Sequence, residues 1–450
     1  MDGRDRPDHD VQGDTDEIMQ TNFTPEHLAS DPRLQASEKI LRSCVHCGFC
    51  TATCPTYLLL GDELDSPRGR IYQIKDMLEN ERPATAEVVK HIDRCLSCLS
   101  CMTTCPSGVH YMHLVDHARA HIEETYRRPF ADRVMRSLIA HVLPHRNRFR
   151  MALVGAAAAR PFARTIGKLP GLARIGAMLA LAPRFPSGRS AVEAPGRFAA
   201  KGERRGRVAL LSGCVQPVLD PAINEATVRL LTRLGIEVVV AKGDGCCGSL
   251  AHHMGREADS HATAKRAIDG WIAEMDGEGL DAIIITASGC GTTIKDYGFM
   301  FREDPAYAEK AARVSAIARD VTEYLETLKL DRVAPPEPLT VAYHSACSMQ
   351  HGQQIRTAPK TLLARAGFTV RDVPEGHICC GSAGTYNMLQ PELSQRLKAR
   401  KLANIAKVTP DIIATGNIGC MTQLASGPTP IVHTIELLDW AYGGPKPEGL

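Results

Sequence analysis

The sequence has little of what a nucleic-acid-binding protein needs. Phe, Trp and Tyr together make up only 5% of the 450 residues, and the formal net charge is only +2. A basic surface interleaved with stacking rings is therefore not expected. Nucleic acid is not an expected partner.

Long apolar runs are missing as well. No stretch reaches the roughly 18 residues of a membrane-spanning helix, because basic residues interrupt the most apolar segment at Arg160, Arg164, Lys168 and Arg174. The N-terminus, from Met1 to Asp5, is polar and lacks the basic start and apolar core of a secretory signal. We expect a cytoplasmic protein with no transmembrane helix and no signal peptide.

The chain also lacks a Gly-rich dinucleotide fingerprint that opens a βαβ unit, so we expect no flavin or nicotinamide site of its own. Cysteine, in contrast, is abundant, with sixteen residues. Reducing thiol pools disfavour a disulfide scaffold in the cytoplasm. The cysteines therefore indicate metal or redox chemistry.

Eight of the cysteines form two dense motifs with the same spacing. In each motif three cysteines are separated by two residues each, and a fourth follows after three intervening residues, just before a proline: Cys44, Cys47, Cys50, Cys54 and Cys95, Cys98, Cys101, Cys105. This spacing is typical of bacterial two-cluster ferredoxins, in which the fourth cysteine of each motif reaches the other cluster. Structural zinc is disfavoured, because zinc sites normally use two separated pairs of ligands. We predict two [4Fe-4S] clusters, bound by Cys44, Cys47, Cys50 and Cys105 and by Cys95, Cys98, Cys101 and Cys54.

The remaining eight cysteines belong to an internal repeat. Three cysteines of the second unit lie 133 positions after three of the first, Cys347, Cys379 and Cys380 after Cys214, Cys246 and Cys247. Each unit reads as three apolar strands separated by helices, at 208–211, 236–240 and 281–285, and at 339–342, 368–373 and 411–414. This alternation predicts a parallel sheet in each unit.

The cysteines of each unit follow strand ends, so we expect them to converge at the carboxyl edge of the sheet, where open α/β sheets place their ligands. The expected groups are Cys214, Cys246, Cys247 and Cys290 in one unit, and Cys347, Cys379, Cys380 and Cys420 in the other. Three interpretations stay open: an iron–sulfur cluster per unit, a catalytic or redox thiol pair, and zinc or purely structural thiols. His344 and His351 are candidates for tuning or ligating the second site, although histidines that contact no metal are more common.

We predict an α+β multidomain protein with an α-helical, ferredoxin-like two-[4Fe-4S] module, a helical linker and two repeated α/β lobes with parallel sheets. Within the module, Ser66 and Pro67 are expected to begin a helix. The basic, apolar stretch 145–185 is expected to be packed linker, with docking on a membrane or a partner subunit as the alternative. The expected boundaries are a mobile tail at 1–34, the module at 35–127, the linker at 128–204, lobe 1 at 205–333 and lobe 2 at 334–450.

Five segments of the sequence resemble those of a known family. They lie at 44–57, 61–72, 344–353, 379–387 and 416–420. Through them the chain resembles the iron–sulfur subunit of bacterial glycolate oxidase over nearly everything from about 40 to 443. Some distant relatives have a fifth cysteine three positions before the last one of each lobe, where this sequence has Ala287 and Asn417.

The resemblance implies a complex in which flavin-containing glycolate oxidase subunits oxidise glycolate to glyoxylate. This chain would pass the electrons toward quinone or another membrane electron acceptor, as a cytoplasmic protein or one bound peripherally to the inner face of the plasma membrane. It assigns no catalytic residue to this chain. The alternatives are an iron–sulfur subunit of a lactate or glycerol-3-phosphate dehydrogenase, or a thiol/disulfide reductase subunit of heterodisulfide reductase type.

Overall fold

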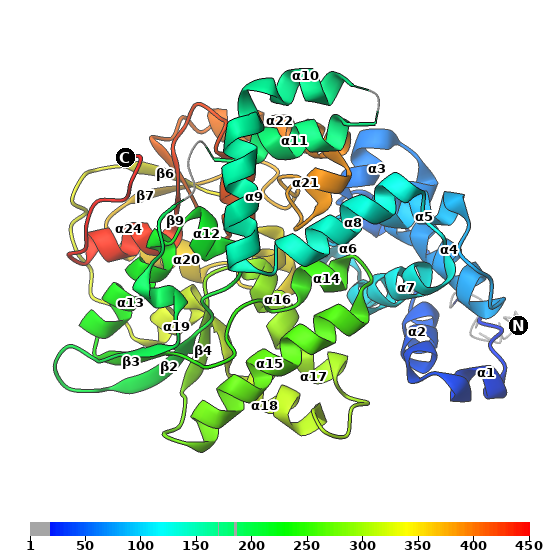
Figure 1. Cartoon of the computed structure of the whole chain (residues 1–450), viewed down its shortest axis with the longest axis horizontal. Helices are drawn as coiled ribbons and strands as arrows, with labels where there is room; N and C mark the ends of the chain where they lie inside the picture. Colours follow the sequence, from blue (N-terminus) through cyan, green and yellow to red (C-terminus); the bar gives the residue numbers. More distant parts are fainter. Residues whose placement is uncertain (1–18, 170, 184–186) are drawn as a thin grey trace, which may run out of the picture.

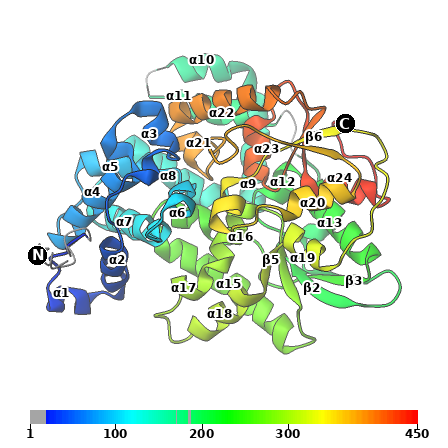
Figure 2. The ribbon, with the colours of Figure 1, turned by 180° about the vertical axis from the view of Figure 1, so that it is seen from behind.

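The computed structural model describes residues 19–169, 171–183 and 187–450. Figure 1 shows a helical N-terminal domain on one side, two sheet-containing lobes on the other, and a group of helices between them. Figure 2 shows the same arrangement from behind. This mixture of a helical part and α/β parts with parallel sheets confirms the predicted fold class at that level.

The N-terminal domain consists of short helices around two cysteine loops. Its helices are α1 (Pro25–Ser30), α2 (Pro32–Arg42), α3 (Pro55–Leu60), α4 (Pro67–Glu79), α5 (Ala86–Asp93), α6 (Ser100–Thr104) and α7 (Tyr111–Thr125). Ser66 caps α4 by accepting a hydrogen bond from the Gly69 N–H, and Pro67 occupies the first position, which confirms the predicted start of this helix. Leu41, Ile74 and Leu114 are among the fully buried core residues.

The N-terminal segment differs from the predicted tail at 1–34. Its first eighteen residues lie outside the described part of the chain. Residues 25–34 form α1 and the start of α2, capped by Thr24 and Asp31. The Met19 side chain is buried, and its N–H donates to the Cys44 carbonyl at 3.1 Å. Caps and a buried anchor stabilise a segment whose polar composition alone suggests a loop.

Four helices connect this domain to the lobes: α8 (Phe130–Val142), α9 (Arg146–Ala159), α10 (Ala163–Lys168) and α11 (Ala173–Leu181). The last two pack against each other at the top of Figure 1. Their close approach requires glycine, because a Cβ on Gly176 would lie 2.5 Å from the Cα of Gly167. We call α8–α11 the bridging helices.

Lobe 1 contains a five-stranded sheet in the order β1-β3-β2-β4-β5. The strands are β1 (Gly196–Phe198), β2 (Gly206–Leu210), β3 (Ile236–Val240), β4 (Ala282–Ile285) and β5 (Ala318–Asp320). The flanking helices are α12 (Gln216–Leu219), α13 (Ala222–Arg233), α14 (Ser249–His253), α15 (Glu257–Asp276), α16 (Ser288–Lys295), α17 (Tyr297–Met300), α18 (Ala308–Ile317) and α19 (Val321–Thr327). Strand β1 pairs antiparallel with β3 and comes from the stretch expected to be linker, so the sheet is not wholly parallel and begins before 205.

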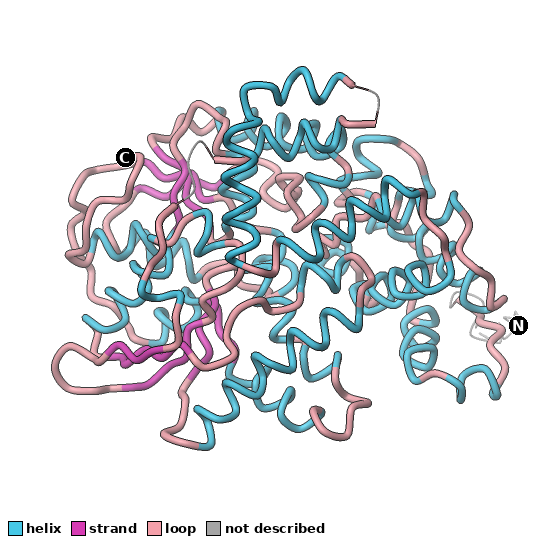
Figure 3. The backbone as a smooth tube through the Cα atoms, in the orientation of Figure 1, coloured by secondary structure: helices cyan, strands magenta, loops and turns pink. Residues whose placement is uncertain are grey.

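Lobe 2 repeats this topology with the order β7-β6-β8-β9. Its strands are β6 (Thr340–Tyr343), β7 (Thr369–Asp372), β8 (Ile412–Thr415) and β9 (Ile431–His433), all paired in parallel. Its helices are α20 (Ala358–Arg365), α21 (Tyr386–Leu389), α22 (Pro391–Ala406), α23 (Ile418–Leu424) and α24 (Thr434–Ala441), with a π-helical turn at Ser348–Gly352. Figure 3 shows the two sheets as separate groups of strands.

The lobes share a hydrophobic core. Residues of both sheets and of α13, α20 and α24 belong to one buried cluster, which includes Val208, Leu230, Val341 and Leu362. At its rim Asp439 of α24 is buried and paired with Arg229 and Arg233 of α13, at 2.8 and 3.1 Å. The shared core fixes one lobe against the other. The sheet edges that carry the cysteines are therefore held in fixed positions relative to each other.

Candidate metal-cluster sites

The first cysteine motif is a tight loop between α2 and α3. Backbone reversals occur at His46 and Gly48, whose φ angles are +50° and +83°. Positive φ angles at these two residues let the loop coil tightly. One small cavity is lined by Cys44, Cys47, Cys50 and Cys105, the four residues predicted to bind one cluster, and Cys101 also borders it.

The second motif has the same loop conformation. Ser97 and Leu99 occupy the positions equivalent to His46 and Gly48 and also have positive φ angles, of +49° and +61°. Three hydrogen-bond donors point at sulfurs of this site: the Ser97 N–H and the Tyr111 hydroxyl at Cys95, at 3.5 and 3.8 Å, and Arg70 at Cys54. Donors of this kind stabilise negatively charged thiolates and clusters.

In lobe 1 the cysteines lie at the carboxyl ends of the strands, as their spacing suggested. Cys214 follows β2, the pair Cys246 and Cys247 follows β3, and Cys290 lies in α16 after β4. Gly248 has φ +83°, and a Cβ there would lie 2.8 Å from the Ser260 carbonyl oxygen. The glycine thus allows the loop to turn back on α15, and its N–H donates to Cys246 Sγ at 3.4 Å.

Lobe 2 has the same arrangement around a second set of sulfurs. Sγ of Cys347 lies 3.6 Å from Sγ of Cys379, and Sγ of Cys380 lies 3.5 Å from Sγ of Cys420. The Gly381 N–H donates to Cys379 Sγ at 3.4 Å, which repeats the contact seen in lobe 1.

The crowding of buried thiols shifts their pKa values: contact with Cys214 and Cys247 lowers the pKa of Cys246, whereas the pKa values of several neighbouring thiols are raised. The pKa of Cys347 is raised well above its ordinary value by contact with Cys379 and by burial, and that of Cys247 by Cys246, by Cys290 and by burial. Such thiols do not ionise readily by themselves, whereas a bound metal ion deprotonates a coordinating thiol. The cysteine groups of both lobes therefore fit an iron–sulfur group.

Both lobe sites open into one cavity of about 490 Å³. All eight lobe cysteines line it, together with Leu96 and Ser97 of the second motif. Its opposite wall is apolar and comes from the bridging helices, with Ile139, Phe149, Leu153, Met178 and Leu179. The sequence did not reveal this cavity, because its walls come from four segments far apart in the chain.

Comparisons with known proteins agree with these features. Residues 40–109 match a family described as a 4Fe-4S dicluster domain, and residues 208–295 and 341–425 each match the cysteine-rich domain called CCG. The chain is 42% identical to the glycolate oxidase iron-sulfur subunit of Escherichia coli (strain K12), over 94% of this chain and 99% of that protein. The chain belongs to the glycolate oxidase iron–sulfur subunit family. It is an iron–sulfur protein.

Other relatives match different shares of this glycolate oxidase iron–sulfur subunit. A Bacillus subtilis (strain 168) protein named "Probable glycolate oxidase iron-sulfur subunit" is 30% identical over 94% of this chain and 99% of its own length. Lactate utilization protein A of Bacillus licheniformis is 27% identical over 52% of this chain and 99% of its own length. Among the described residues of this chain, every helix is too short or too polar to span a membrane.

In this iron–sulfur subunit the second motif packs directly against lobe 2. Cys98 and Cys379 belong to one buried cluster with Ile378 and Leu397, and Cys347 borders it. The Thr103 hydroxyl lies 2.7 Å from Nδ1 of His351. The second-motif sulfurs and the lobe 2 sulfurs are therefore neighbours.

The N-terminal domain also contacts lobe 1 through two buried or half-buried pairs. His252 of α14 lies 3.1 Å from Asp116 of α7, and His113 lies 2.9 Å from Asp296. Although burial favours the neutral forms, the mutual attraction raises the pKa of His252 and lowers that of Asp116 to about 2. Asp116 is therefore charged near neutral pH, and its charge favours the protonated form of His252.

The two histidines singled out in the sequence have different surroundings. His351 is fully engaged, with Nδ1 on Thr103 and Nε2 on the His377 carbonyl oxygen. His344 is buried beside Cys380 and Cys420, and neither of its ring nitrogens has a hydrogen-bond partner. The ring nitrogens of His344 are therefore available to bind a ligand at the lobe 2 site, whereas both ring nitrogens of His351 are already engaged.

Arg70 is a site residue that the sequence analysis did not identify. Its guanidinium is buried, donates to the His91 carbonyl at 2.8 Å and pairs with Asp65 at 3.3 Å. The sequence places Arg70 on the buried face of an amphipathic helix. Buried arginines are rare unless they are paired, so this position could have identified Arg70 as a site residue.

Proposed function

We propose that this chain carries electrons within a glycolate oxidase complex, from a flavin-containing partner subunit that oxidises glycolate to glyoxylate toward a quinone. Oxidation of glycolate releases two electrons and two protons, which a flavin accepts together. Each cluster, when bound, takes up and releases one electron at a time. The observation that supports this proposal is the series of neighbouring cysteine sites that begins at the surface and ends at the apolar cavity.

We propose the ligand sets that the cysteine spacing predicts. Two clusters in the N-terminal domain would be held by Cys44, Cys47, Cys50 and Cys105, and by Cys95, Cys98, Cys101 and Cys54. The lobes would each hold one further iron–sulfur cluster, through Cys214, Cys246, Cys247 and Cys290 in lobe 1 and Cys347, Cys379, Cys380 and Cys420 in lobe 2.

The first motif is proposed as the point of electron entry. Cys47 is the one exposed residue of the sixteen cysteines, all of which are described. Phe49 in the same loop is 61% exposed, and Tyr72, which stacks on His46, is 55% exposed; Leu58 and Leu64 of the following segment are also exposed. Exposed large apolar side chains that gather in one place are typical of a protein interface. We assign this surface to the flavin-containing partner.

The apolar cavity is proposed as the point of electron exit. It borders the sulfurs of both lobes, and its far wall is built from aliphatic and aromatic side chains of the bridging helices. A quinone ring is planar and apolar with polar oxygens at its edge, and sites for such ligands are mostly apolar with few polar groups. The position of the cavity between the lobes supports electron delivery to a bound quinone.

The outer surface of the bridging helices supports peripheral membrane binding. Large apolar side chains are exposed there, namely Phe130, Val134, Met151, Val154, Phe162 and Leu169. The neighbouring basic residues Arg148, Arg160, Arg164 and Lys168 form no ion pair within the described ranges. Apolar side chains flanked by unpaired cations are typical of proteins that bind the interface of anionic membranes.

The test uses the assembled complex, with glycolate as reductant and two electron acceptors. Cys380→Ala should abolish electron transfer to a short-chain quinone, while reduction of a soluble dye that accepts electrons from the first cluster remains. Cys47→Ala should impair both. If Cys380→Ala leaves quinone reduction unchanged, the proposed exit through the lobes is wrong.

A further inference from the structure

His344 follows β6 directly, at the carboxyl edge of the lobe 2 sheet. Its backbone N–H donates to the Ala414 carbonyl of β8 at 2.8 Å, which fixes the residue beside the strand that leads to Cys420. The residue is only 1% exposed. The fold therefore holds the imidazole inside the protein, at the level where the cysteines converge.

Neither ring nitrogen of His344 has a hydrogen-bond partner among the residues that the structure describes. A buried polar group left without a partner destabilises the fold, so most buried polar side chains have a hydrogen-bond partner. His433 is equally buried and has both nitrogens engaged, with the Thr286 carbonyl and the Ile435 N–H. Within the described part of the chain, His344 is the one histidine with both ring nitrogens buried and unpartnered.

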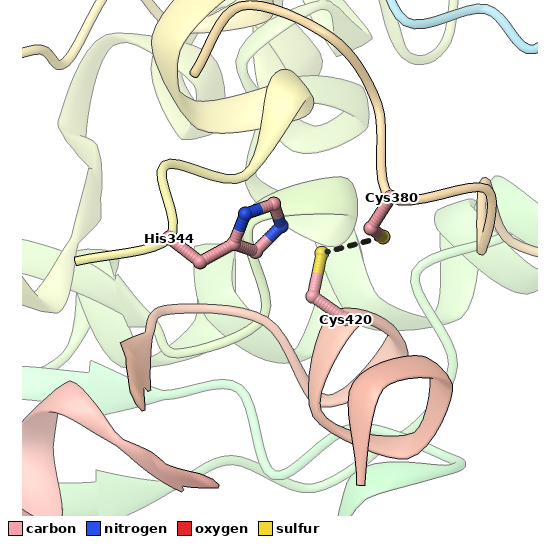
Figure 4. Close-up of side chains that lie close together, drawn as sticks. All are labelled: His344, Cys380 and Cys420. Atoms are coloured by element: carbon pink, nitrogen blue, oxygen red, sulfur yellow. Dashed lines mark hydrogen bonds between the residues drawn. The ribbon is translucent and has the colours of Figure 1, made fainter. Parts of the chain in front are cut away.

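The unpartnered ring lies against two sulfurs. A ring nitrogen of His344 and the Sγ atoms of Cys380 and Cys420 all lie within 4.8 Å of one another. Figure 4 shows the ring beside these two sulfurs, which come from the loop after β7 and from α23. Two thiols and an imidazole nitrogen at these separations are a donor set for a metal.

The feature distinguishes lobe 2 from lobe 1. The residue three positions before the first lobe cysteine is His344 in lobe 2 and Leu211 in lobe 1. Asn417, three positions before Cys420, is already engaged: its Nδ2 donates to Ser288 Oγ at 2.8 Å and its Oδ1 accepts from the Gly419 N–H at 2.8 Å. An additional ligand is therefore available in lobe 2 from His344, and the matching position of lobe 1 has only an aliphatic side chain.

We propose that His344 binds iron of the lobe 2 cluster through one ring nitrogen, so that the two lobe clusters have different ligand sets. The inference rests on the proposed function in one respect, namely that lobe 2 holds an iron–sulfur cluster. One nitrogen lone pair forms the bond to iron, and the other ring nitrogen keeps its proton. His344 would therefore be a ligand in addition to the four thiolates proposed for lobe 2, with no counterpart in lobe 1.

The test is pulsed EPR on the full chain, purified with its clusters and labelled with ¹⁵N-histidine, after chemical reduction. The lobe 2 signal is identified as the one that disappears, together with its iron, in Cys380→Ala. In the wild type this signal should show the strong coupling of a directly bound ¹⁵N nucleus. The coupling should be lost in His344→Leu, which copies the residue of lobe 1, and kept in the control His351→Asn.

Two outcomes overturn the inference while the proposed function stands: a lobe 2 signal without strong ¹⁵N coupling in the wild type, or coupling that persists in His344→Leu. If Cys380→Ala changes neither iron content nor any signal, the lobe 2 cluster itself is refuted, and the inference fails with it. Leu211→His gives an independent check that does not depend on the stability of His344→Leu. It places an imidazole at the matching position of lobe 1 and should add ¹⁵N coupling to the lobe 1 signal, and an unchanged lobe 1 signal would contradict the proposed geometry.

Discussion

Nη1 of Arg70 lies 3.9 Å from Sγ of Cys54, and both side chains are buried in the N-terminal domain. Arg70 lies on α4, between the two cysteine loops, and its charge is balanced by Asp65. Asp65 also contacts His91 and Arg94, at 3.0 and 2.7 Å. A guanidinium that touches a proposed cluster ligand stabilises the more negative, reduced state of that cluster.

Replacing Arg70 should therefore lower the reduction potential of the second cluster. At an effective dielectric constant of about 20, a unit charge about 4 Å away is worth at most about 4 kcal/mol, which corresponds to roughly 170 mV for one electron. Arg70→Met should show a fall of this order in an EPR-monitored redox titration. Arg70→Lys keeps the charge and should recover most of the potential; equal potentials in Arg70→Met and the wild type would contradict the assignment.

The proposed ligand sets predict which cluster the fourth cysteine of each motif binds. Cys54→Ala should disturb the cluster held by the second motif, and Cys105→Ala the cluster held by the first, since each fourth cysteine reaches the neighbouring cluster. The two reduced clusters should lose their magnetic coupling in both variants. EPR spectra that show Cys54→Ala damaging only the first-motif cluster would refute this pairing.

The contact between the N-terminal domain and lobe 1 should depend on pH through His252 and Asp116. The pKa of His252 is raised by Asp116, so its contribution to stability is complete below about pH 6.5 and is lost as the pH rises through the higher folded value. The pKa of Asp116 is lowered from 3.8 to about 2, so its contribution is present above about pH 4 and is lost as the pH falls toward 2. The interface should be most stable between these limits.

Hydrogen exchange of α7 and α14 at several pH values measures this dependence. His252→Gln keeps a hydrogen-bonding side chain and removes the titration, so protection in the variant should be lower at pH 5.5 and flatter with pH. An identical pH profile in the variant would rule out this pair as its source.

The outer surface of the bridging helices should control membrane association. Met151, Val154 and Phe162 are 75%, 62% and 63% exposed, so replacing them with Ser should cost little folding stability. Co-sedimentation with vesicles containing anionic phospholipid should fall at least about tenfold, since each lost large apolar contact removes about 1.5–3 kcal/mol when it is fully buried. The matched control Phe49→Ser removes an exposed aromatic from the opposite domain and should leave vesicle binding unchanged.

Local sequence patterns predicted the elements with strong periodicity and clear boundaries. The six predicted strands correspond to β2, β3, β4, β6, β7 and β8. Five of them are buried parallel strands, which read as short runs of apolar residues, whereas β7 is a largely exposed edge strand. The start of α4 was predicted from Ser66 and Pro67 for a similar local reason. The cysteine motifs were recognisable because the ligand spacing is set by the loop itself.

Features that depend on distant contacts were missed. Strands β1, β5 and β9 have only three residues each, which is too short for a periodic pattern, and they form by pairing with strands already in place. The shared cavity and the Asp116–His252 pair join segments more than a hundred positions apart. The different environments of His344 and His351 also arise from tertiary neighbours, since both histidines lie close to the same cysteine in the sequence.

The central claim is that cysteine sites extend from the surface of the N-terminal domain through both lobes, each site holding an iron–sulfur cluster. The most direct measurement is the iron content of the purified chain together with its reduced-state EPR spectrum, compared among the wild type, Cys247→Ala and Cys380→Ala. Four tetranuclear clusters predict about sixteen irons per chain, a loss of about four irons in each variant, and the disappearance of a different signal in each. A wild-type content of about eight irons that neither substitution changes would contradict the account.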